Sequence, residues 1–501
     1  MQDVLLTVAG SDSCSGAGIQ RDTQVCCNLG VHALNVITAI TAQNAHKVYK
    51  IESVSDNMFV AQLNALKDDF SIKVIKSGML ATVGQVLELA KLLKYRRDIL
   101  CICDPVMVAT SGDILMHTEV LDAIKKELLV RVDIFTPNLQ EAQMLLSLKI
   151  TKTITLPQML NMAKKISELY GIENVLLKGG HNEGNKAVDC YFNYKRNQVL
   201  WLSINKFLNN SDIHGSGCTL SAAIGGFLVK GYDTNNSIVL AKAYISSAIK
   251  HAERLSKKGS LFLKDLGFPA DSNTFPKTYL NLRGLSFKKI NKIGLYPVVD
   301  SSDWVLFLAK QGIKTIQLRI KNMPQEDIRN EVIQAIEYQN QYNLQLFIND
   351  HYNLAIEYGA FGVHLGHEDI VKIHECGSDA LSQIFNKNIA LGLSTHDYFE
   401  LSVASSLNPS YIALGPIFPT ETKKMKFSAQ GINRIKEWQK LVNLPLVAIG
   451  GIKEAHITEI ARTGVDGIAA VSLITFADNP VAVINNIKVL ISKGWQNERV
   501  I

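Results

Sequence analysis

Residues 100–105, Leu-Cys-Ile-Cys-Asp-Pro, place four apolar residues directly before an acid and a proline. Such a run is typical of a short buried strand that ends in a turn. Similar runs recur at 4–8, 73–75, 133–135 and 174–177, and helical patterns occupy 57–69, 156–170, 219–230 and 235–255. This alternation of strands with amphipathic helices predicts a parallel sheet sandwiched between helices.

The rhythm of the sequence changes after this series. Residues 257–289 are rich in Lys, Ser, Asn and Pro without a sustained period, which indicates a domain boundary. Strand candidates then follow at 294–299, 315–318, 344–348, 362–365, 389–392, 411–414, 446–449 and 467–471. Eight strand-helix units in roughly 210 residues is the size of a small TIM (β/α)8 barrel. We therefore predict an α/β chain with a first domain at 1–265, a linker at 266–289 and a barrel at 290–501.

Length and composition limit the classes of protein that the chain can represent. A chain of 501 residues is too long for one core, and 47% hydrophobic with 20% charged residues excludes collagen, coiled coil and disorder. The net charge of +6 comes from 52 basic and 46 acidic residues without a dense basic stripe, so we expect no nucleic-acid partner. The eight cysteines show no zinc spacing, and we expect neither a targeting leader nor a membrane span, because the first apolar run has no basic residues before it and no run is long enough to cross a bilayer. We expect a cytoplasmic protein without a membrane partner, and the sequence leaves homo-oligomer formation open.

A Gly-rich stretch at 214–219, His-Gly-Ser-Gly-Cys-Thr, opens one of the predicted helices. Backbone N–H groups near Gly215 and Gly217 at a helix N-terminus favour a bound phosphate, although a tight packing turn is the alternative. Cys218 lies where the helix dipole favours a thiolate, so it is a candidate general base, with simple packing as the alternative.

Polar residues also follow the predicted strands. Asp104 and Lys178 stand at strand ends, where open α/β sheets place their ligands, although either could be a solvated turn residue. Asn138 and Glu141 share one face of a first helical turn and could orient water around Mg²⁺. An N-cap Asn with an acidic third residue is the alternative for this pair.

Several strings of the first half resemble the hydroxymethylpyrimidine/phosphomethylpyrimidine kinases of the ribokinase superfamily over about residues 1–265. These are VAGSD (8–12), GAGIQ (16–20), ITA (37–39), AQN (42–44), KSGML (76–80), DPVM (104–107), TPN (136–138), KGGH (178–181) and HGSGCTLS (214–221).

The resemblance assigns roles to individual residues. It implies that Gly10, Asp22, Gln43, Met79 and Val106 line a pyrimidine pocket. It further implies that Asp104, Asn138, Glu141, Lys178, Gly215 and Gly217 serve ATP and Mg²⁺, with Lys178 and Cys218 catalytic. Many members of the wider superfamily carry Asp at the position of Cys218, and Cys14 and Ser15 also depart from the common pattern. A pyridoxal-type kinase would share the same phosphate machinery.

The second half carries polar residues at the carboxyl ends of its predicted strands, the face on which barrel enzymes act. Asp350 and Asp369 could hold one Mg²⁺, although each acid alone suits a helix N-cap. Gln317, Arg319 and Lys321 alternate along one strand and so point to one side, which describes a diphosphate clamp.

The later loops of the barrel add a second phosphate site. The loop at 415–424 supplies hydroxyls and cations on a segment long enough to close as a lid, with a solvated loop as the alternative. Gly450-Gly451 and Val471-Ser472 follow strands seven and eight, where TIM barrels commonly bind a phosphate monoester. Two phosphate sites imply two phosphorylated substrates.

These strings resemble thiamine-phosphate synthase over about residues 290–495. The matching strings are QLR (317–319), ND (349–350), GVHLG (362–366), GLS (392–394), LGPIFPTETK (414–423) and IGGI (449–452). The resemblance implies that Asp350 and Asp369 bind Mg²⁺. It implies that the substrates contact Gln317, Arg319, Lys321, Asn349, Ser394, Thr420, Thr422, Lys423, Gly451, Val471 and Ser472, with Arg319 and Lys423 catalytic. His367 stands where Gln is usual.

The two resemblances describe consecutive reactions. ATP-dependent phosphorylation of hydroxymethylpyrimidine and its monophosphate would give a diphosphate, which Mg²⁺-dependent coupling with thiazole phosphate would convert to thiamine phosphate. We therefore expect a bifunctional transferase with small-molecule substrates. A pyridoxal-type kinase fused to a thiazole tautomerase-like or non-catalytic phosphate-binding barrel is the alternative.

Overall fold

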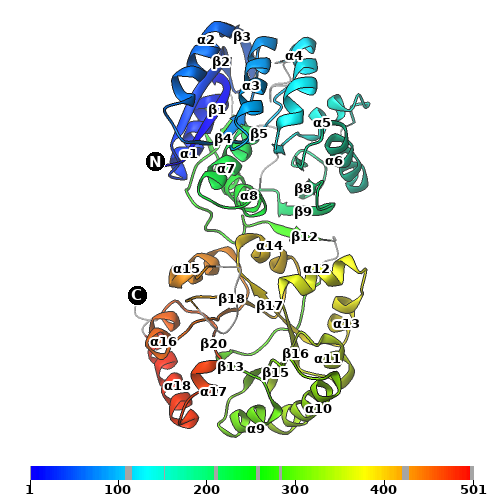
Figure 1. Ribbon diagram of the computed structural model, residues 1–501, viewed down its shortest axis with the longest axis vertical. Coiled ribbons are helices and arrows are strands. Elements are labelled where there is room, and N and C mark those ends of the chain that lie inside the picture. Colours follow the sequence, from blue (N-terminus) through cyan, green and yellow to red (C-terminus); the bar gives the residue numbers. More distant parts are fainter. Residues whose placement is uncertain are drawn as a thin grey trace. The chain divides into compact units, whose positions relative to one another are not determined.

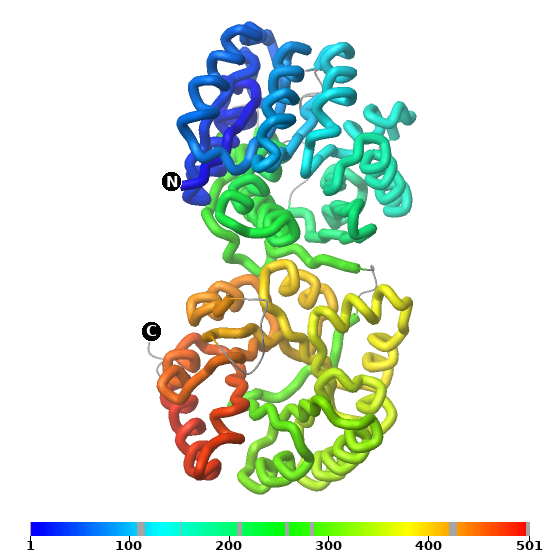
Figure 2. The backbone as a smooth tube through the Cα atoms, viewed as in Figure 1, coloured from blue at the N-terminus to red at the C-terminus, as the bar shows by residue number. Residues whose placement is uncertain are grey.

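The computed structural model describes residues 2–107, 116–151, 153–207, 213–255, 260–280, 285–419 and 428–496. The chain divides into two compact units, Met1–Tyr279 and Leu280–Ile501. Figure 2 traces the backbone of both. No helix in the part of the chain that the structure describes is long and apolar enough to span a membrane.

The first unit is built on a ten-stranded sheet with the order β12-β9-β8-β7-β6-β5-β4-β1-β2-β3. Its central strands, from β7 to β2, are parallel, and the strands at both edges are antiparallel. The strands are β1 (Val4–Asp12), β2 (Ala33–Asn44), β3 (Lys47–Ser53), β4 (Ile72–Ser77), β5 (Leu100–Cys103), β6 (Ile134–Phe135), β7 (Asn174–Leu177), β8 (Lys186–Asn193), β9 (Gln198–Asn205) and β12 (Lys277–Tyr279). A separate short pair is formed by β10 (Glu253–Arg254) and β11 (Leu261–Phe262).

Helices cover both faces of this sheet (Figure 1). They are α1 (Gly18–Asn28), α2 (Asp56–Lys67), α3 (Val83–Tyr95), α4 (Thr118–Ala123), η1 (Ile124–Leu128), η2 (Leu129–Arg131), α5 (Leu139–Leu145), α6 (Leu156–Tyr170), α7 (Ser216–Val229) and α8 (Thr234–Lys250). Helix α7 packs against α1, α8 and the central strands on one face, whereas α2 and α3 pack together on the other. The predicted sandwich is therefore confirmed.

The alternation of side chains along β1 explains the two layers. Leu6 and Val8 join the large apolar core beneath α2 to α6, and Leu5 points to the opposite face. A Cβ at Gly225 of α7 would lie 2.5 Å from Cδ1 of Leu5. Glycine is therefore required here because it lets α7 approach the sheet closely.

The predicted linker at 266–289 contains a strand of the first sheet. Lys277–Tyr279 forms β12, which pairs antiparallel with Trp201–Ser203 of β9. Backbone hydrogen bonds hold this part of the segment, so it is structured over these residues.

The second unit is a closed barrel of eight parallel strands, which confirms the predicted TIM architecture. The strands are β13 (Gly294–Val299), β14 (Thr315–Leu318), β15 (Gln345–Asn349), β16 (Gly362–Leu365), β17 (Ala390–Thr395), β18 (Tyr411–Leu414), β19 (Leu446–Ala448) and β20 (Gly467–Ala470). The helices are α9 (Ser302–Lys310), α10 (Gln325–Tyr342), α11 (Tyr352–Tyr358), α12 (His367–Glu375), α13 (Ala380–Asn386), α14 (Tyr398–Ser406), α15 (Gly431–Leu441), α16 (Glu454–Ala461), α17 (Ser472–Thr475) and α18 (Pro480–Gln496). Helices follow the strands around the outside of the barrel (Figure 1).

Three aromatic rings fill the barrel interior. Tyr296, Phe347 and Tyr411 are buried and meet edge to face, with centroids 5.1 to 6.0 Å apart. Neighbouring strands carry glycine at the facing positions, since a Cβ at Gly362 would overlap the Phe347 ring and one at Gly392 would overlap the Tyr411 ring. Large rings on β13, β15 and β18 thus pack against glycines on β16 and β17 to fill the barrel core.

Candidate active sites

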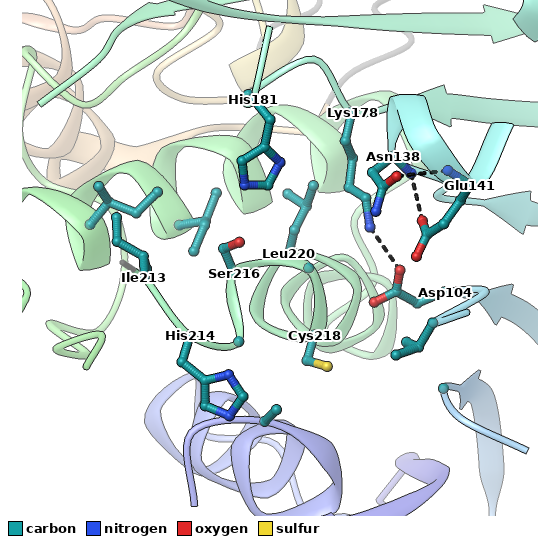
Figure 3. A pocket seen from close by; sticks show the side chains of 18 of the residues that line it. Asp104, Asn138, Glu141, Lys178, His181, Ile213, His214, Ser216, Cys218 and Leu220 are labelled. Atoms are coloured by element: carbon teal, nitrogen blue, oxygen red, sulfur yellow. Dashed lines mark hydrogen bonds and ion pairs between the residues drawn. The ribbon is translucent and has the colours of Figure 1, made fainter. Parts of the chain in front are cut away.

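A cavity of about 740 Å³ lies at the carboxyl edge of the parallel strands in the first unit (Figure 3). It lies where β1, β4, β5, β6 and β7 end and where α7 begins. The predicted residues that line it are Gly10, Gln43, Met79, Val106, Asp104, Asn138, Glu141, Lys178, Gly215, Gly217 and Cys218. Strand-end placement therefore brings all but one of the residues singled out in the first half into one cavity.

The charged centre of this cavity is an ion pair between two strand ends. Nζ of Lys178 donates to Oδ1 of Asp104 at 2.7 Å, as Figure 3 shows. Oγ of Ser221 in α7 donates to the other carboxylate oxygen of Asp104 at 3.2 Å. Burial alone would lower the pKa of Lys178, but the negative charges of Asp104 and Glu141 outweigh it and raise that pKa. Lys178 is thus held as a cation in the cavity wall.

Asn138 and Glu141 form the capping box that begins helix α5. Oδ1 of Asn138 accepts from the Glu141 backbone N–H at 2.8 Å, and Oε2 of Glu141 accepts from the Asn138 N–H at 2.7 Å. The structural alternative for this pair is therefore present in the fold. Burial raises the pKa of Glu141, with the charge of Asp104 adding to the rise and Lys178 opposing it. The pair both caps α5 and faces the cavity.

The Gly-rich turn before α7 is tightly fitted to the loop after β1. Gly215 has φ of 80°, in the left-handed region that favours glycine, and a Cβ there would overlap the carbonyl oxygen of Gly16. A Cβ at Gly217 would lie 3.2 Å from Nζ of Lys178. The backbone at the start of α7 is therefore exposed to the cavity next to a buried cation, which is the arrangement of an anion site.

Cys218 does not have the thiolate character that its place at a helix start predicts. It is buried, and burial raises the pKa of its thiol to about 11, even though the charge of Lys76 acts in the opposite direction. Desolvation of the anion therefore outweighs the helix dipole, although the residue lines the cavity. Burial thus opposes the thiolate that the place of Cys218 at a helix start predicts.

Asp22 is the predicted pocket residue that does not line the cavity. Its carboxylate is fully buried behind the wall, where it accepts from Oγ1 of Thr7 at 2.5 Å and pairs with Nζ of Lys76 at 2.8 Å. These contacts occupy the carboxylate. The structure therefore corrects the expectation that Asp22 lines a pyrimidine pocket. Burial alone would lower the pKa of Lys76, but Asp22 outweighs it and raises that pKa.

Lys76 itself lines the cavity and was missed from the sequence. The signal was available, because Lys76 ends a predicted strand beside Gly78 and Met79. A lysine buried in an apolar strand needs a carboxylate partner, because an unpaired buried charge is costly. Asp22 on α1 supplies that carboxylate.

At the mouth of the barrel, polar side chains from β14 and β15 form a hydrogen bond. Nε2 of Gln317 donates to Oδ1 of Asn349 at 2.8 Å, and both residues are buried. Asp350 follows at once with φ of 63°, and its backbone N–H donates to the His364 carbonyl at 3.0 Å. The left-handed backbone turns the chain at the strand end, where Asp350 stands.

The acids and cations predicted at the barrel mouth are close enough to shift the pKa of Asp350. Burial raises the pKa of Asp350, the charge of Asp369 raises it further, and Lys321 and Arg319 oppose the rise. Oδ2 of Asp369 accepts from the Gly366 backbone N–H at 2.9 Å at the start of α12. The two acids and two cations therefore face the same end of the barrel.

Ser394 ends a buried hydrogen-bonded relay that sequence reasoning missed. Oγ of Ser394 lies 2.7 Å from Nε2 of His364, whose Nδ1 lies 2.6 Å from the hydroxyl of Tyr411. That hydroxyl in turn lies 2.7 Å from the hydroxyl of Tyr296. Burial lowers the pKa of His364 to about 3, and the charge of Arg319 adds to the effect, so the ring is neutral. Alternation along β16 gives a signal for this histidine, but spacing alone does not pair it with two tyrosines.

The remaining predicted barrel residues lie on later loops. Gly451 has φ of 65°, and a Cβ there would overlap the carbonyl oxygen of Phe418 in the loop after β18. Val471 precedes α17, and its carbonyl accepts from the Ile474 N–H at 3.1 Å, with Ser472 as the first residue of that helix. Thr420, Thr422 and Lys423 lie outside the described residues.

The fold and these two sites are those of a two-domain α/β enzyme that acts on small molecules. A family model described as phosphomethylpyrimidine kinase matches residues 12–261, and one described as thiamine monophosphate synthase matches residues 295–474. A probable thiamine biosynthetic bifunctional enzyme, chloroplastic, from Oryza sativa subsp. japonica is 31% identical over 503 residues, covering 97% of this chain and 88% of that protein.

Two further proteins match one unit each. Thiamine-phosphate synthase from Photorhabdus laumondii is 48% identical over 190 residues, which cover 37% of this chain and 84% of that protein. The solved structure of pyridoxal kinase from Staphylococcus aureus in complex with ADP is 28% identical with a TM-score of 0.48, covering 53% of this chain and 93% of that one.

The chain belongs to the family of bifunctional thiamine biosynthetic enzymes. It is a transferase with a phosphomethylpyrimidine kinase domain and a thiamine-phosphate synthase domain, and it acts in thiamine biosynthesis. The predicted function is confirmed at this level, and the alternative of a pyridoxal-type kinase fused to a non-catalytic barrel is not better supported.

Proposed function

We propose that the cavity of the first unit phosphorylates hydroxymethylpyrimidine and then its monophosphate. The observation that carries this proposal is the convergence of Lys178, Asp104 and the start of α7 on one cavity. Backbone N–H groups of the Gly215–Cys218 turn would hold the transferred phosphate, and Lys178 would neutralise its charge. Gly10, Gln43, Met79 and Val106 form the wall available to the pyrimidine ring. We assign this activity to residues 1–265.

The acids of this cavity fit a magnesium ion bound together with ATP phosphates. Asp104 and Glu141 are both buried beside one lysine, and the charge of Asp104 helps to raise the pKa of Glu141. Carboxylate oxygens are the ligands that Mg²⁺ prefers, and the ion would neutralise charge on the phosphates. Asn138 would orient water at the same place, while its backbone and side chain keep α5 capped.

We propose Cys218 as the acceptor of the substrate hydroxyl proton. Its pKa of about 11 makes the thiolate a strong but scarce base, with about one molecule in ten thousand ionised at pH 7. Lys76, whose charge favours the thiolate, would stabilise it when it forms.

We propose that the barrel, residues 290–501, couples the pyrimidine diphosphate with thiazole phosphate. Asp350 after β15 and Asp369 in the first turn of α12, after β16, fit Mg²⁺ because the charge of Asp369 raises the pKa of Asp350, which a divalent cation would offset. The ion would supply charge stabilisation to the departing diphosphate. Arg319, Lys321 and Asn349 would hold that diphosphate.

The electron-rich aminopyrimidine can support positive charge at its methylene carbon while the diphosphate leaves. The thiazole nitrogen then attacks that carbon, so no protein nucleophile is needed. Ser394, held by the neutral His364, would orient the ring, and Gly451, Val471 and Ser472 would receive the thiazole phosphate. The products are thiamine phosphate and diphosphate.

A single incubation tests this assignment. The full chain is mixed with hydroxymethylpyrimidine, MgATP and thiazole phosphate, and pyrimidine phosphates and thiamine phosphate are separated by chromatography. We expect pyrimidine monophosphate, diphosphate and thiamine phosphate to form in that order. Failure to form thiamine phosphate, together with its formation when pyrimidine diphosphate is added, would refute the kinase assignment alone.

We further propose a cytoplasmic location, which localisation of the tagged chain in its cells would test.

A further inference from the structure

Three potential metal ligands of different chemistry meet beside the kinase cavity. Asp12 ends β1, Cys14 lies two residues later, and His214 directly precedes the Gly-rich turn of α7. Oδ2 of Asp12 lies 3.0 Å from Nε2 of His214 and 3.4 Å from Sγ of Cys14. One ligand atom from each residue lies within 4.8 Å of the other two. Asp12 and His214 also line the cavity.

The two distances from Asp12 Oδ2 are close to those between neighbouring ligand atoms of a tetrahedral zinc site. Zinc bonds of about 2.3 Å to sulfur and about 2.0 Å to nitrogen or oxygen, at tetrahedral angles, place neighbouring ligand atoms about 3.3 to 3.6 Å apart. The sulfur–oxygen and nitrogen–oxygen distances of the cluster require only a few tenths of an ångström of movement to meet that geometry. Carboxylate, thiolate and imidazole are also the three ligand types that Zn²⁺ prefers.

The charges of the cluster balance a divalent cation. Asp12 and an ionised Cys14 supply two negative charges, and neutral His214 supplies none, so a bound Zn²⁺ leaves the cluster uncharged. A neutral assembly is the cheapest way to hold ions in a partly buried place. The backbone N–H groups of Gly16 and Ala17 donate to Asp12 Oδ2 at 3.0 and 2.8 Å, and each carboxylate oxygen offers about two acceptor sites, so a metal bond to Oδ2 competes with these hydrogen bonds and weakens the site.

We propose that Asp12, Cys14 and His214 form a binding site for Zn²⁺ at the edge of the kinase cavity, with the fourth position open to the cavity. On binding, bonds form from the metal to Sγ of Cys14, Nε2 of His214 and Oδ2 of Asp12. The Cys14 thiol loses its proton to solvent, and the imidazole proton moves from Nε2 to Nδ1. No oxidation or reduction takes place.

The surroundings of His214 set the strength of this site. Its Nδ1 is buried and has no hydrogen-bond partner among the described residues. Zinc-bound histidines normally donate their second ring N–H to an acceptor, which strengthens the metal bond. With three protein ligands and no such acceptor, the site binds more weakly than a four-ligand structural zinc site and exchanges its metal readily.

Cobalt substitution provides the direct test on the full chain. Co²⁺ bound to a thiolate in a tetrahedral site gives an intense sulfur-to-metal charge-transfer band, which Mg²⁺-type oxygen sites do not give. We expect one equivalent of Co²⁺ to develop this band, and added Zn²⁺ to abolish it. Absence of the band on the unaltered chain would overturn the proposal without affecting the proposed kinase activity.

Two substitutions identify the ligands. Cys14→Ser should remove the band and weaken Zn²⁺ binding at least about tenfold, since even loss of an outer contact costs that much. Cys27→Ser, at an exposed cysteine, is the matched control and should retain both. Cys14→Ala provides a second variant, and the thermal unfolding midpoint of each variant without metal checks that it is folded. Unchanged Zn²⁺ affinity in folded Cys14→Ser or Cys14→Ala would refute the assignment.

Discussion

The high pKa of Cys218 makes a quantitative prediction about the kinase reaction. If the thiolate accepts the substrate proton, the rate follows the ionised fraction of the thiol. With a pKa of about 11, that fraction rises about tenfold for each pH unit between about pH 7 and pH 10. The sign is fixed, because a group that acts in its deprotonated form gains activity as the pH rises toward its pKa.

Replacement of the thiol by a carboxylate removes this dependence. In Cys218→Asp the base is already ionised at neutral pH, since an ordinary Asp has a pKa of about 4 and burial raises it by a few units at most. We expect kcat of the variant to be nearly independent of pH over the range in which the native enzyme gains about a thousandfold in thiolate.

The assay measures ADP release from ATP with saturating hydroxymethylpyrimidine at each pH. Cys27→Ser is the control, because it removes an exposed thiol that does not line the cavity. It should keep the steep profile of the native chain. A flat profile in the native chain, or full activity in Cys218→Ser, would assign the thiol to packing and refute the role of base.

Three further outcomes follow from the geometry. Asp350→Ala should abolish coupling and leave ADP release unchanged, measured by chromatography of the products; retained coupling would exclude this acid from the metal site. Asp22→Ala should lower the free energy of unfolding by about 3 to 5 kcal/mol because it leaves the buried Lys76 charge unpaired, and a loss below about 1 kcal/mol in denaturant titration would contradict that role. His364 keeps its ring neutral down to about pH 3, so its contribution to stability is present above its unfolded pKa of about 6.5 and is lost as the pH falls from there toward 3. His364→Asn should therefore reduce the acid sensitivity of unfolding by up to about 1.4 kcal/mol per pH unit in that window, and an identical pH dependence in both proteins would rule out this role.

The strands that could be predicted from the sequence are those buried on both faces. Residues 100–103 and 174–177 are short apolar runs, and the structure has strands with these bounds. The hairpin of β8 and β9 was missed because polar residues such as Asp189 and Ser203 interrupt its apolar positions. Asp189 is satisfied by an ion pair with Lys242 at 2.6 Å, a partner 53 residues away that no local pattern reveals.

The candidate sites could be predicted as far as backbone position determines them. Asp104 and Lys178 end neighbouring regions of the parallel sheet, so their meeting follows from topology. The pKa and the burial of each side chain could not be predicted in the same way. The high pKa of Cys218 depends on its burial in the folded chain, and the withdrawal of Asp22 from the cavity depends on Lys76.

The most direct test of two separate, consecutive active sites is complementation between two damaged chains. Lys178→Ala loses a cation of the kinase cavity, and Asp350→Ala loses an acid of the barrel. Each is supplied with hydroxymethylpyrimidine, MgATP and thiazole phosphate, alone and mixed, and thiamine phosphate is quantified. We expect almost none from either variant alone and restored synthesis from the mixture, because the pyrimidine diphosphate diffuses from one chain to the other. Thiamine phosphate from Asp350→Ala alone, or an inactive mixture of folded variants, would contradict it.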